Sequence, residues 1–279
     1  MGDFTLFNEV RNNSSRSAKE INNFEVLGCD SGTRGVHIAW MFPDVLSMHG
    51  GRGDAMALMH FSNLMKLPCT IRRVNTLTEE IPFDWADMML FPSGDISVME
   101  DVSRALKTKK EEFLKFGDSG KVILVVGSTG ALLADKTVFQ DGNEIEGLGL
   151  LHMIMKQRVK VHGDDLWITL PDGKELFGTQ IQLADVGLQK GQAPFGKVVY
   201  GRGNHGKKHE GARTKNVIFT HLLGPVLSKN PIFTAELLKL AAKSAGLDTD
   251  GIVLEEKDYL LEKAALEDHK TFIKKKIDG

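Results

Sequence analysis

The sequence predicts an α/β protein with a mostly parallel central sheet, helices on both faces and a β-rich second half. In the first half, short apolar runs alternate with helical stretches, which is the pattern of a parallel sheet covered by helices. After residue 151, short strand-like runs follow one another with turns such as the one at Pro171 between them. That spacing favours antiparallel pairing, and the two patterns together indicate the fold class.

Composition excludes several classes of function. The chain has 279 residues, of which 42% are apolar and 26% are charged, as in an ordinary globular protein. A net charge of −2 gives no reason to expect binding to nucleic acid. No apolar run reaches about 18 residues, so we expect no membrane insertion. The first residues lack the pattern of a signal peptide, and we therefore expect a cytoplasmic protein.

The two cysteines, Cys29 and Cys69, are too few for a disulfide scaffold or a cysteine metal site. This agrees with a reducing compartment. Cys69 lies in a predicted strand and is expected to be a buried, inert thiol. Cys29 lies in a glycine-rich stretch that we expect to be a loop.

The first 35 residues are polar and have little periodicity, so we treat 1–35 as an N-terminal extension to a domain that covers 36–279. The domain opens with a strand at 36–41, a glycine-rich loop at 50–53 and a helix at 54–66. The remaining elements expected in the first half are strands at 69–74, 88–91 and 122–126 and one long helix at 96–116.

The second half is expected to hold short strands and two closing helices. One helix is predicted at 234–245, with Thr234 as its N-cap and Gly246 at its end. A charged helix is predicted at 257–276. The expected strands are 158–161, 166–169, 180–183, 197–200 and 217–220.

The stretch 121–134 carries the most information about chemistry. A buried strand runs directly into a glycine turn and then into a helix-forming segment, which is the shape of a nucleophile elbow. Such a turn lifts one side chain above the strand end, where a helix N-terminus stabilises negative charge. The residue predicted at the tip is Gly127, which has no side chain.

Several segments in the same order resemble the class I glutamine amidotransferase domains of the cobyric acid synthase (CobB/CobQ) and GatD type. FPDVLSMHGGRGD at 42–54 resembles the family's YPDLLNLYGDRGN, and DGNEIEGLGLL at 141–151 is similar to its DG…IEGLGLL. YGRGNHGKKHEG at 200–211 and GPVLSKNP at 224–231 resemble GYGNN…EG and GPLLPKNP. The resemblance implies a flavodoxin-like fold and glutamine hydrolysis, in which a cysteine thiolate attacks the side-chain amide, a histidine moves the proton and backbone N–H groups hold the oxyanion.

This chain departs from the family at each of those functional positions. The elbow CGGYQLLG corresponds to 127–134, so the nucleophile falls on Gly127, and GTYLHGP corresponds to 219–225, so the histidine falls on Leu223. The oxyanion loop GGGQD reads PSGDI at 92–96, where a proline removes one donor. In GYEIHMG, the Glu and His positions hold Gln180 and Gln182. The resemblance therefore implies that no catalytic residue remains in its family position.

Alternative nucleophiles are Ser128 and Thr129, with His221 as base; His221 lies two residues before the family position. The competing interpretation, which we favour, is that both hydroxyls cap the helix that follows them. His205 and His209, with Glu210, have i, i+4 spacing, but the surrounding glycines and lysines favour a solvated loop over a metal site. No nucleotide or cofactor motif is present, and we expect neither a metal nor a cofactor.

Two functions stay open at the level of sequence. The first is a GatD-like pseudoenzyme that acts as a binding, scaffold or regulatory subunit of an amide ligase, with a Mur-ligase-like (MurT-type) partner of peptidoglycan synthesis. The second is an amidotransferase or hydrolase that uses Ser128 or Thr129. A small carboxylate or glutamine-like ligand is a further expectation, with the binding residues Gly94, Gly127, Ser128, Thr129, Gln180, Gln182 and Arg52.

Overall fold

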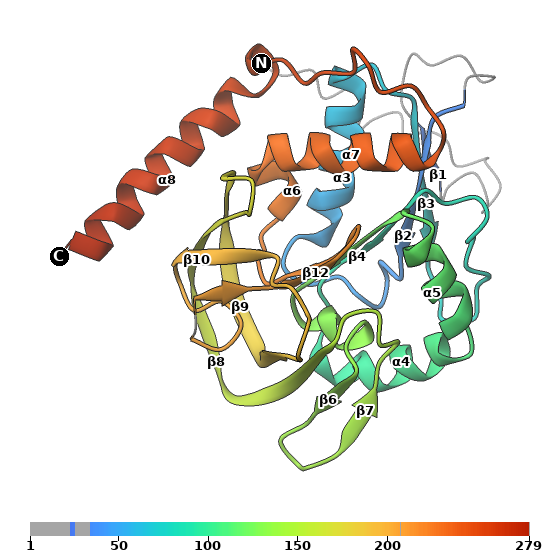
Figure 1. Cartoon of the computed structure of the whole chain (residues 1–279), viewed down its shortest axis with the longest axis vertical. Helices are drawn as coiled ribbons and strands as arrows, with labels where there is room; N and C mark the ends of the chain where they lie inside the picture. The colour runs from blue at the N-terminus through green and yellow to red at the C-terminus, as the bar shows by residue number, and fades with distance from the viewer. Residues whose placement is uncertain (1–22, 26–33, 207, 279) are drawn as a thin grey trace.

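The computed structural model describes residues 23–25, 34–206 and 208–278 (Figure 1). Its main sheet consists of β1 (Asn23–Glu25), β2 (Val36–Met41), β3 (Cys69–Val74), β4 (Met88–Phe91), β5 (Val122–Val126), β12 (Ala212–Thr214) and β13 (Val217–Thr220). Their order across the sheet is β1-β3-β2-β4-β5-β13-β12. The strands from β3 to β13 are parallel, and β1 and β12 are antiparallel at the two edges.

The predicted α/β fold is confirmed, and the strands β2, β3, β4, β5 and β13 have the bounds expected from the sequence. Every residue of β4, β5 and β13 is buried. A parallel strand that is covered on both faces reads as a continuous apolar run. This is why these strands could be recognised in the sequence.

Two apolar cores lie on opposite faces of the main sheet. Side chains alternate along β2, so Ile38 and Trp40 enter one core while Ala39 and Met41 enter the other. Helices α3 (Gly51–Leu64) and α7 (Pro231–Ser244) cover the first face, and α4 (Met99–Lys107) and α5 (Lys110–Asp118) cover the second (Figure 1).

A second, mixed sheet packs against these cores. It consists of β6 (Lys136–Val138), β7 (Glu144–Glu146), β8 (Met153–Thr169), β9 (Glu175–Leu188), β10 (Gly196–Tyr200) and β11 (His209–Glu210). Its order is β11-β10-β8-β6-β7, with β9 paired to β8. The sequence predicted two short strands at 158–161 and 166–169, whereas β8 is one strand of 17 residues. The prediction missed residues 153–157 and the polar, glycine-containing stretch 162–165, which separates the two predicted strands in the sequence.

All four helix predictions were wrong at their boundaries; the charged helix expected at 257–276, for example, runs from 260 to 278. The glycines at 51–53 belong to α3, because Gly51 packs directly on Pro92 and Gly53 on Pro225, where a Cβ would clash. The expected helix at 96–116 is a 3₁₀ turn, η1 (Ile96–Val98), followed by α4 and α5, with a break at 108–109 that lets Phe113 and Phe116 pack on Phe83.

Helix α7 begins earlier than predicted. Asn230 is its N-cap and Pro231 its first residue, which is the position that proline favours. The hydroxyl of Thr234, the predicted cap, instead donates to the carbonyl of Leu227 at 2.6 Å, with the carbonyl of Asn230 as a second acceptor at 3.1 Å. Helix α6 (Val226–Lys229) directly precedes α7.

The C-terminal helix α8 (Leu260–Asp278) follows the 3₁₀ turn η3 (Glu256–Tyr259) and lies at the outer edge of the molecule (Figure 1). Ile273 anchors it against Trp167 and Phe177. Cys69 is buried as predicted, and Cys29 lies outside the described residues. No helix within the described ranges is both long and apolar enough to cross a membrane.

Candidate functional site

The tip of the predicted elbow lies where β5 ends. Val126 is the last strand residue, and Gly127 follows with a φ of 66°, a left-handed conformation that favours glycine. The chain then enters η2 (Gly127–Leu132), a 3₁₀ helix of six residues. The expected strand and sharp turn are therefore present, but the helix after the turn is a short 3₁₀ segment.

The space in front of Gly127 is filled by two side chains. A Cβ built on Gly127 would lie 2.6 Å from Ser93 Oγ and 3.1 Å from Leu223 Cδ2. Ser93 and Leu223 are each 3% exposed. The structure thus brings the two family positions, 127 and 223, together at the elbow, but an aliphatic side chain and a hydroxyl occupy the volume between them.

The hydroxyls of Ser128 and Thr129 bind the loop after β4 instead of capping η2. Ser128 Oγ donates to the carbonyl of Gly94, and Thr129 Oγ1 donates to the carbonyl of Pro92 at 2.7 Å. No side chain caps η2. The helix-cap interpretation was therefore wrong, because the backbone acceptors that these hydroxyls reach come from another segment of the chain.

The same loop would have to supply the oxyanion donors of a glutaminase. The N–H of Gly94 donates to Thr129 Oγ1 at 3.1 Å, and Pro92 has no N–H. The backbone N–H of Gly94 is therefore already hydrogen-bonded to a side chain of the elbow. Thr129 thus joins the elbow to this loop through one donated and one accepted hydrogen bond.

His221 pairs with a buried carboxylate and not with a hydroxyl of the elbow. Its ring Nδ1 lies 3.3 Å from Glu210 Oε1, and its backbone N–H donates to the same oxygen at 2.6 Å. Thr220 Oγ1 donates to the other carboxylate oxygen at 3.2 Å. Among the described residues, no hydrogen bond joins His221 to Ser128 or Thr129, and the buried Nε2 of His221 has no partner.

Glu210 is a residue that the sequence interpretation missed. It was assigned to a solvated loop, yet it is fully buried in the short strand β11. Flanking glycines and lysines suggested exposure, and nothing local signalled the pairing with His221 eleven residues away. His205 and His209 do not form a metal site with it, since no cluster of metal-ligating side chains occurs in the described part of the chain.

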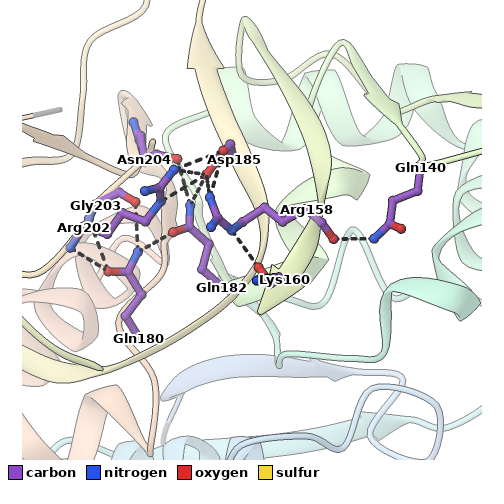
Figure 2. A network of polar contacts seen from close by, with 9 residues as sticks. All are labelled: Gln140, Arg158, Lys160, Gln180, Gln182, Asp185, Arg202, Gly203 and Asn204. Atoms are coloured by element: carbon purple, nitrogen blue, oxygen red, sulfur yellow. Dashed lines mark hydrogen bonds and ion pairs between the residues drawn. The ribbon is translucent and has the colours of Figure 1, made fainter. Parts of the chain in front are cut away.

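Gln180 and Gln182 are buried in β9 and hold the 202–204 segment (Figure 2). The side-chain amide of Gln180 donates to the carbonyl of Gly203 at 2.9 Å, and its oxygen accepts from the N–H groups of Arg202 and Gly203. Gln182 donates to the carbonyl of Asn204 at 2.8 Å. These amides bind the protein's own backbone, and a ligand role for them stays a prediction.

Arg52 is exposed in the first turn of α3, between Gly51, which packs on Pro92, and Gly53, which packs on Pro225. Two residues later, Asp54 is 3% exposed and accepts from the N–H of Leu227 at 2.8 Å. Burial raises the pKa of Asp54 from 3.8 to about 7, and the hydrogen bond from Leu227 offsets this only in part. Asp54 thereby ties α3 to the start of α6, which follows the segment that carries Leu223.

Comparison with known proteins identifies relatives of this chain. It is 26% identical over 217 residues to the lipid II isoglutaminyl synthase (glutamine-hydrolyzing) subunit GatD of Streptococcus pneumoniae, covering 75% of this chain and 81% of that protein. It is 28% identical over 212 residues to the subunit of the same name from Staphylococcus aureus, covering 73% and 83%. No family model matches the chain.

Solved structures support the same fold. A crystal structure of a glutamine amidotransferase matches with a TM-score of 0.50 and 15% identity, covering 75% of this chain and 100% of that one. The PurLQS structure from Thermotoga maritima matches with a TM-score of 0.50 and 14% identity, covering 76% and 97%. The resemblance seen in the sequence motifs is thus confirmed: the chain is a homologue of the GatD subunits and has the fold of the class I glutamine amidotransferases.

Proposed function

We propose that this chain is a GatD-like subunit without glutaminase activity, which serves an amide ligase of cell-wall synthesis as a binding, scaffold or regulatory subunit. Both relatives are named as subunits of a glutamine-hydrolyzing lipid II isoglutaminyl synthase. Their likeness to this chain supports a role in peptidoglycan synthesis, in the cytoplasm, beside a Mur-ligase-like partner of the MurT type. The domain at 36–279 would carry this role.

The observation that supports the loss of activity best is the filled space at Gly127. A glutaminase needs a thiolate at this tip and room for the substrate's amide in front of it. Here Ser93 and Leu223 occupy that room, and the loop donor at Gly94 is already bonded. Loss of nucleophile and base together removes most of the catalysis, because the two act as one unit.

An enzyme that uses Ser128 or Thr129 finds no support in this geometry. Both hydroxyls donate to backbone carbonyls, so neither is directed at a base. A base must lie within hydrogen-bond reach of the proton that it takes. His221 Nδ1 faces Glu210, and its other ring nitrogen, Nε2, is buried with no hydrogen-bond partner among the described residues, so neither nitrogen contacts Ser128 or Thr129.

The test is to express the chain with a Mur-ligase-like protein from the same genome and purify the two together. We expect a stable complex that amidates its acceptor with ammonium as nitrogen source but not with glutamine. The Staphylococcus aureus GatD with its own ligase is the positive control for the use of glutamine. Failure to form any complex would contradict the scaffold role, and amidation with glutamine would contradict the loss of activity.

A further inference from the structure

The polar network of Figure 2 includes an unusual arrangement of charges where β8 and β9 meet. The guanidiniums of Arg158 and Arg202 both bind the carboxylate of Asp185, with Arg158 at 2.9 Å and Arg202 at 3.0 Å from Oδ1. Gln182 donates to the same oxygen at 3.4 Å. One carboxylate therefore serves two guanidiniums, and the pair of arginines carries positive charge that Asp185 does not neutralise.

Two lysines add to this excess. Lys156 and Lys160 are exposed, and within the described residues neither forms an ion pair. Together with Arg158 and Asp185 they line an open hollow of about 450 Å³. Gln157 and Val159 complete its lining. Three cations, one already occupied carboxylate and these two uncharged side chains therefore surround a space that is large enough for a small anionic ligand.

A bulge in the sheet creates this hollow. Residue 157 of β8 pairs with 184 of β9, but the next pair is 162 with 182, so the four residues 158–161 oppose residue 183 alone. Val159 is 85% exposed, which shows that the bulge stands out from the sheet. Bulges occur where a strand must redirect its side chains, and this is common beside functional sites.

The bulge is held in place from several sides. Arg158 Nε donates to the carbonyl of Lys160 at 3.0 Å, and the side-chain amide of Gln140 donates to the carbonyl of Arg158. The backbone N–H of Gln140 donates to Gln157 Oε1 at 3.0 Å. The guanidinium of Arg158 is therefore fixed before any ligand arrives, and such preorganisation reduces the entropy lost on binding.

We propose that this hollow, which we call the β8 bulge site (Lys156, Arg158, Lys160 and Asp185), binds a phosphate-class anion, best a diphosphate. Guanidiniums and ammonium groups are the side chains that hold phosphoryl oxygens. The excess of positive charge suits an anion with several charges better than a single carboxylate. The site lies roughly 20 Å along β9 from Thr179, which pairs with Leu223 at the elbow, and Gln180 and Gln182 lie between the two and bond to Asp185 through Gln182.

The test uses inorganic diphosphate as the probe, with binding measured by titration calorimetry at low ionic strength. The variant Lys156→Gln/Lys160→Gln is expected to lower the affinity at least tenfold and to reduce its dependence on salt. The matched control Lys115→Gln/Lys243→Gln removes the same charge from exposed positions on α5 and α7 and should bind as the natural chain does. Thermal unfolding of each variant checks that the fold is kept.

A second arm distinguishes a free diphosphate from a lipid headgroup. The same proteins are sedimented with phosphatidylcholine vesicles that contain phosphatidylglycerol. The proposal is supported if a probe binds the natural chain and the control but not Lys156→Gln/Lys160→Gln. Which probe does so shows whether the site takes a free diphosphate or a lipid headgroup. Absence of binding to both probes, or an equal loss in both variants, would overturn the proposal.

Discussion

At the scale of single residues, the elbow is closed by a few side chains with complementary roles. Gly127 permits the left-handed turn, and Ser93 and Leu223 fill the space that its missing side chain leaves. Thr129 joins the elbow to the loop after β4, since its hydroxyl donates to Pro92 and accepts from Gly94. These contacts pack the turn at Gly127 against the loop after β4 and against Leu223.

Thr129→Val tests the importance of the two hydrogen bonds that join Thr129 to the loop after β4. Valine keeps the shape of threonine but leaves a buried carbonyl and a buried N–H without partners, and each such loss costs about 1–3 kcal/mol. We expect the free energy of unfolding to fall by about 2–6 kcal/mol in a denaturant titration. The control is Thr108→Val, at an exposed threonine that is the C-cap of α4. An equal fall in the free energy of unfolding at both positions would contradict a stabilising role for the hydrogen bonds of Thr129.

Asp54 gives a prediction about pH. The folded protein keeps this proton up to about pH 7 because burial raises the pKa of the carboxyl, whereas the unfolded chain releases it near pH 4. The contribution of Asp54 to stability is therefore full below about pH 4 and is lost as the pH rises through about 7. Asp54→Asn removes this dependence. The free energy of unfolding of the variant, relative to that of the natural chain, should therefore rise by up to about 4 kcal/mol between about pH 4 and 8.

Denaturant titrations of both proteins across this range measure the difference. The side-chain oxygen of the introduced asparagine can still accept the N–H of Leu227, so the tie between α3 and α6 is kept. A difference in the free energy of unfolding that stays constant across the whole range would contradict the raised pKa of Asp54.

At the scale of elements, α8 is held by one apolar anchor and several ion pairs. Ile273 is fully buried against Trp167 and Phe177. Around it, His269 lies 3.1 Å from Asp165, and Lys270 lies 2.8 Å from Glu175. Surface ion pairs contribute little on their own, so the anchor should carry most of the docking energy.

Ile273→Asp is therefore expected to release α8 from β8 and β9. A buried charge without a partner is costly, and the freed helix should be cut by trypsin much faster than in the natural chain. Ile277→Asp is the matched control, because Ile277 is 52% exposed on the same helix. Equal cleavage rates of the two variants would contradict the claim that Ile273 holds α8 in place.

The elements differ in how well the sequence predicts them, for physical reasons. Strands such as β4 and β5 are apolar along their whole length because both faces are covered, so they were recognisable. The glycines at the start of α3 were assigned to a loop, since their role is close packing on Pro92 and Pro225. Such contacts join segments far apart in the chain and leave no local pattern.

Within the candidate site, too, features with a local sequence pattern were predicted and contacts between distant segments were not. The tip at Gly127 and its neighbour Leu223 followed from aligned motifs. The partners of Ser128 and Thr129 lie 34 and 37 residues earlier in the chain, and the pairing of Glu210 with His221 joins two separate segments. Periodicity describes one segment at a time, so it cannot reveal these long-range hydrogen bonds.

At the scale of the whole molecule, the chain keeps the amidotransferase fold while its site is filled. It has a mainly parallel central sheet and a sharp turn after β5, and its sequence is similar to those of the GatD subunits. A fold alone does not determine an activity, because activity depends on the groups at the site. The proposed loss of activity is therefore decided by whether glutamine is hydrolysed.

The most direct measurement is ammonia release from glutamine by the purified chain, alone and with its ligase partner. We predict no release above the uncatalysed rate. The variant Ser93→Gly/Gly127→Cys/Leu223→His supplies a thiol, a base and the space in front of them, and any release from it would show that the frame is otherwise intact. Release by the natural chain that Ser128→Ala or His221→Ala abolishes would contradict the loss of activity and identify an active enzyme.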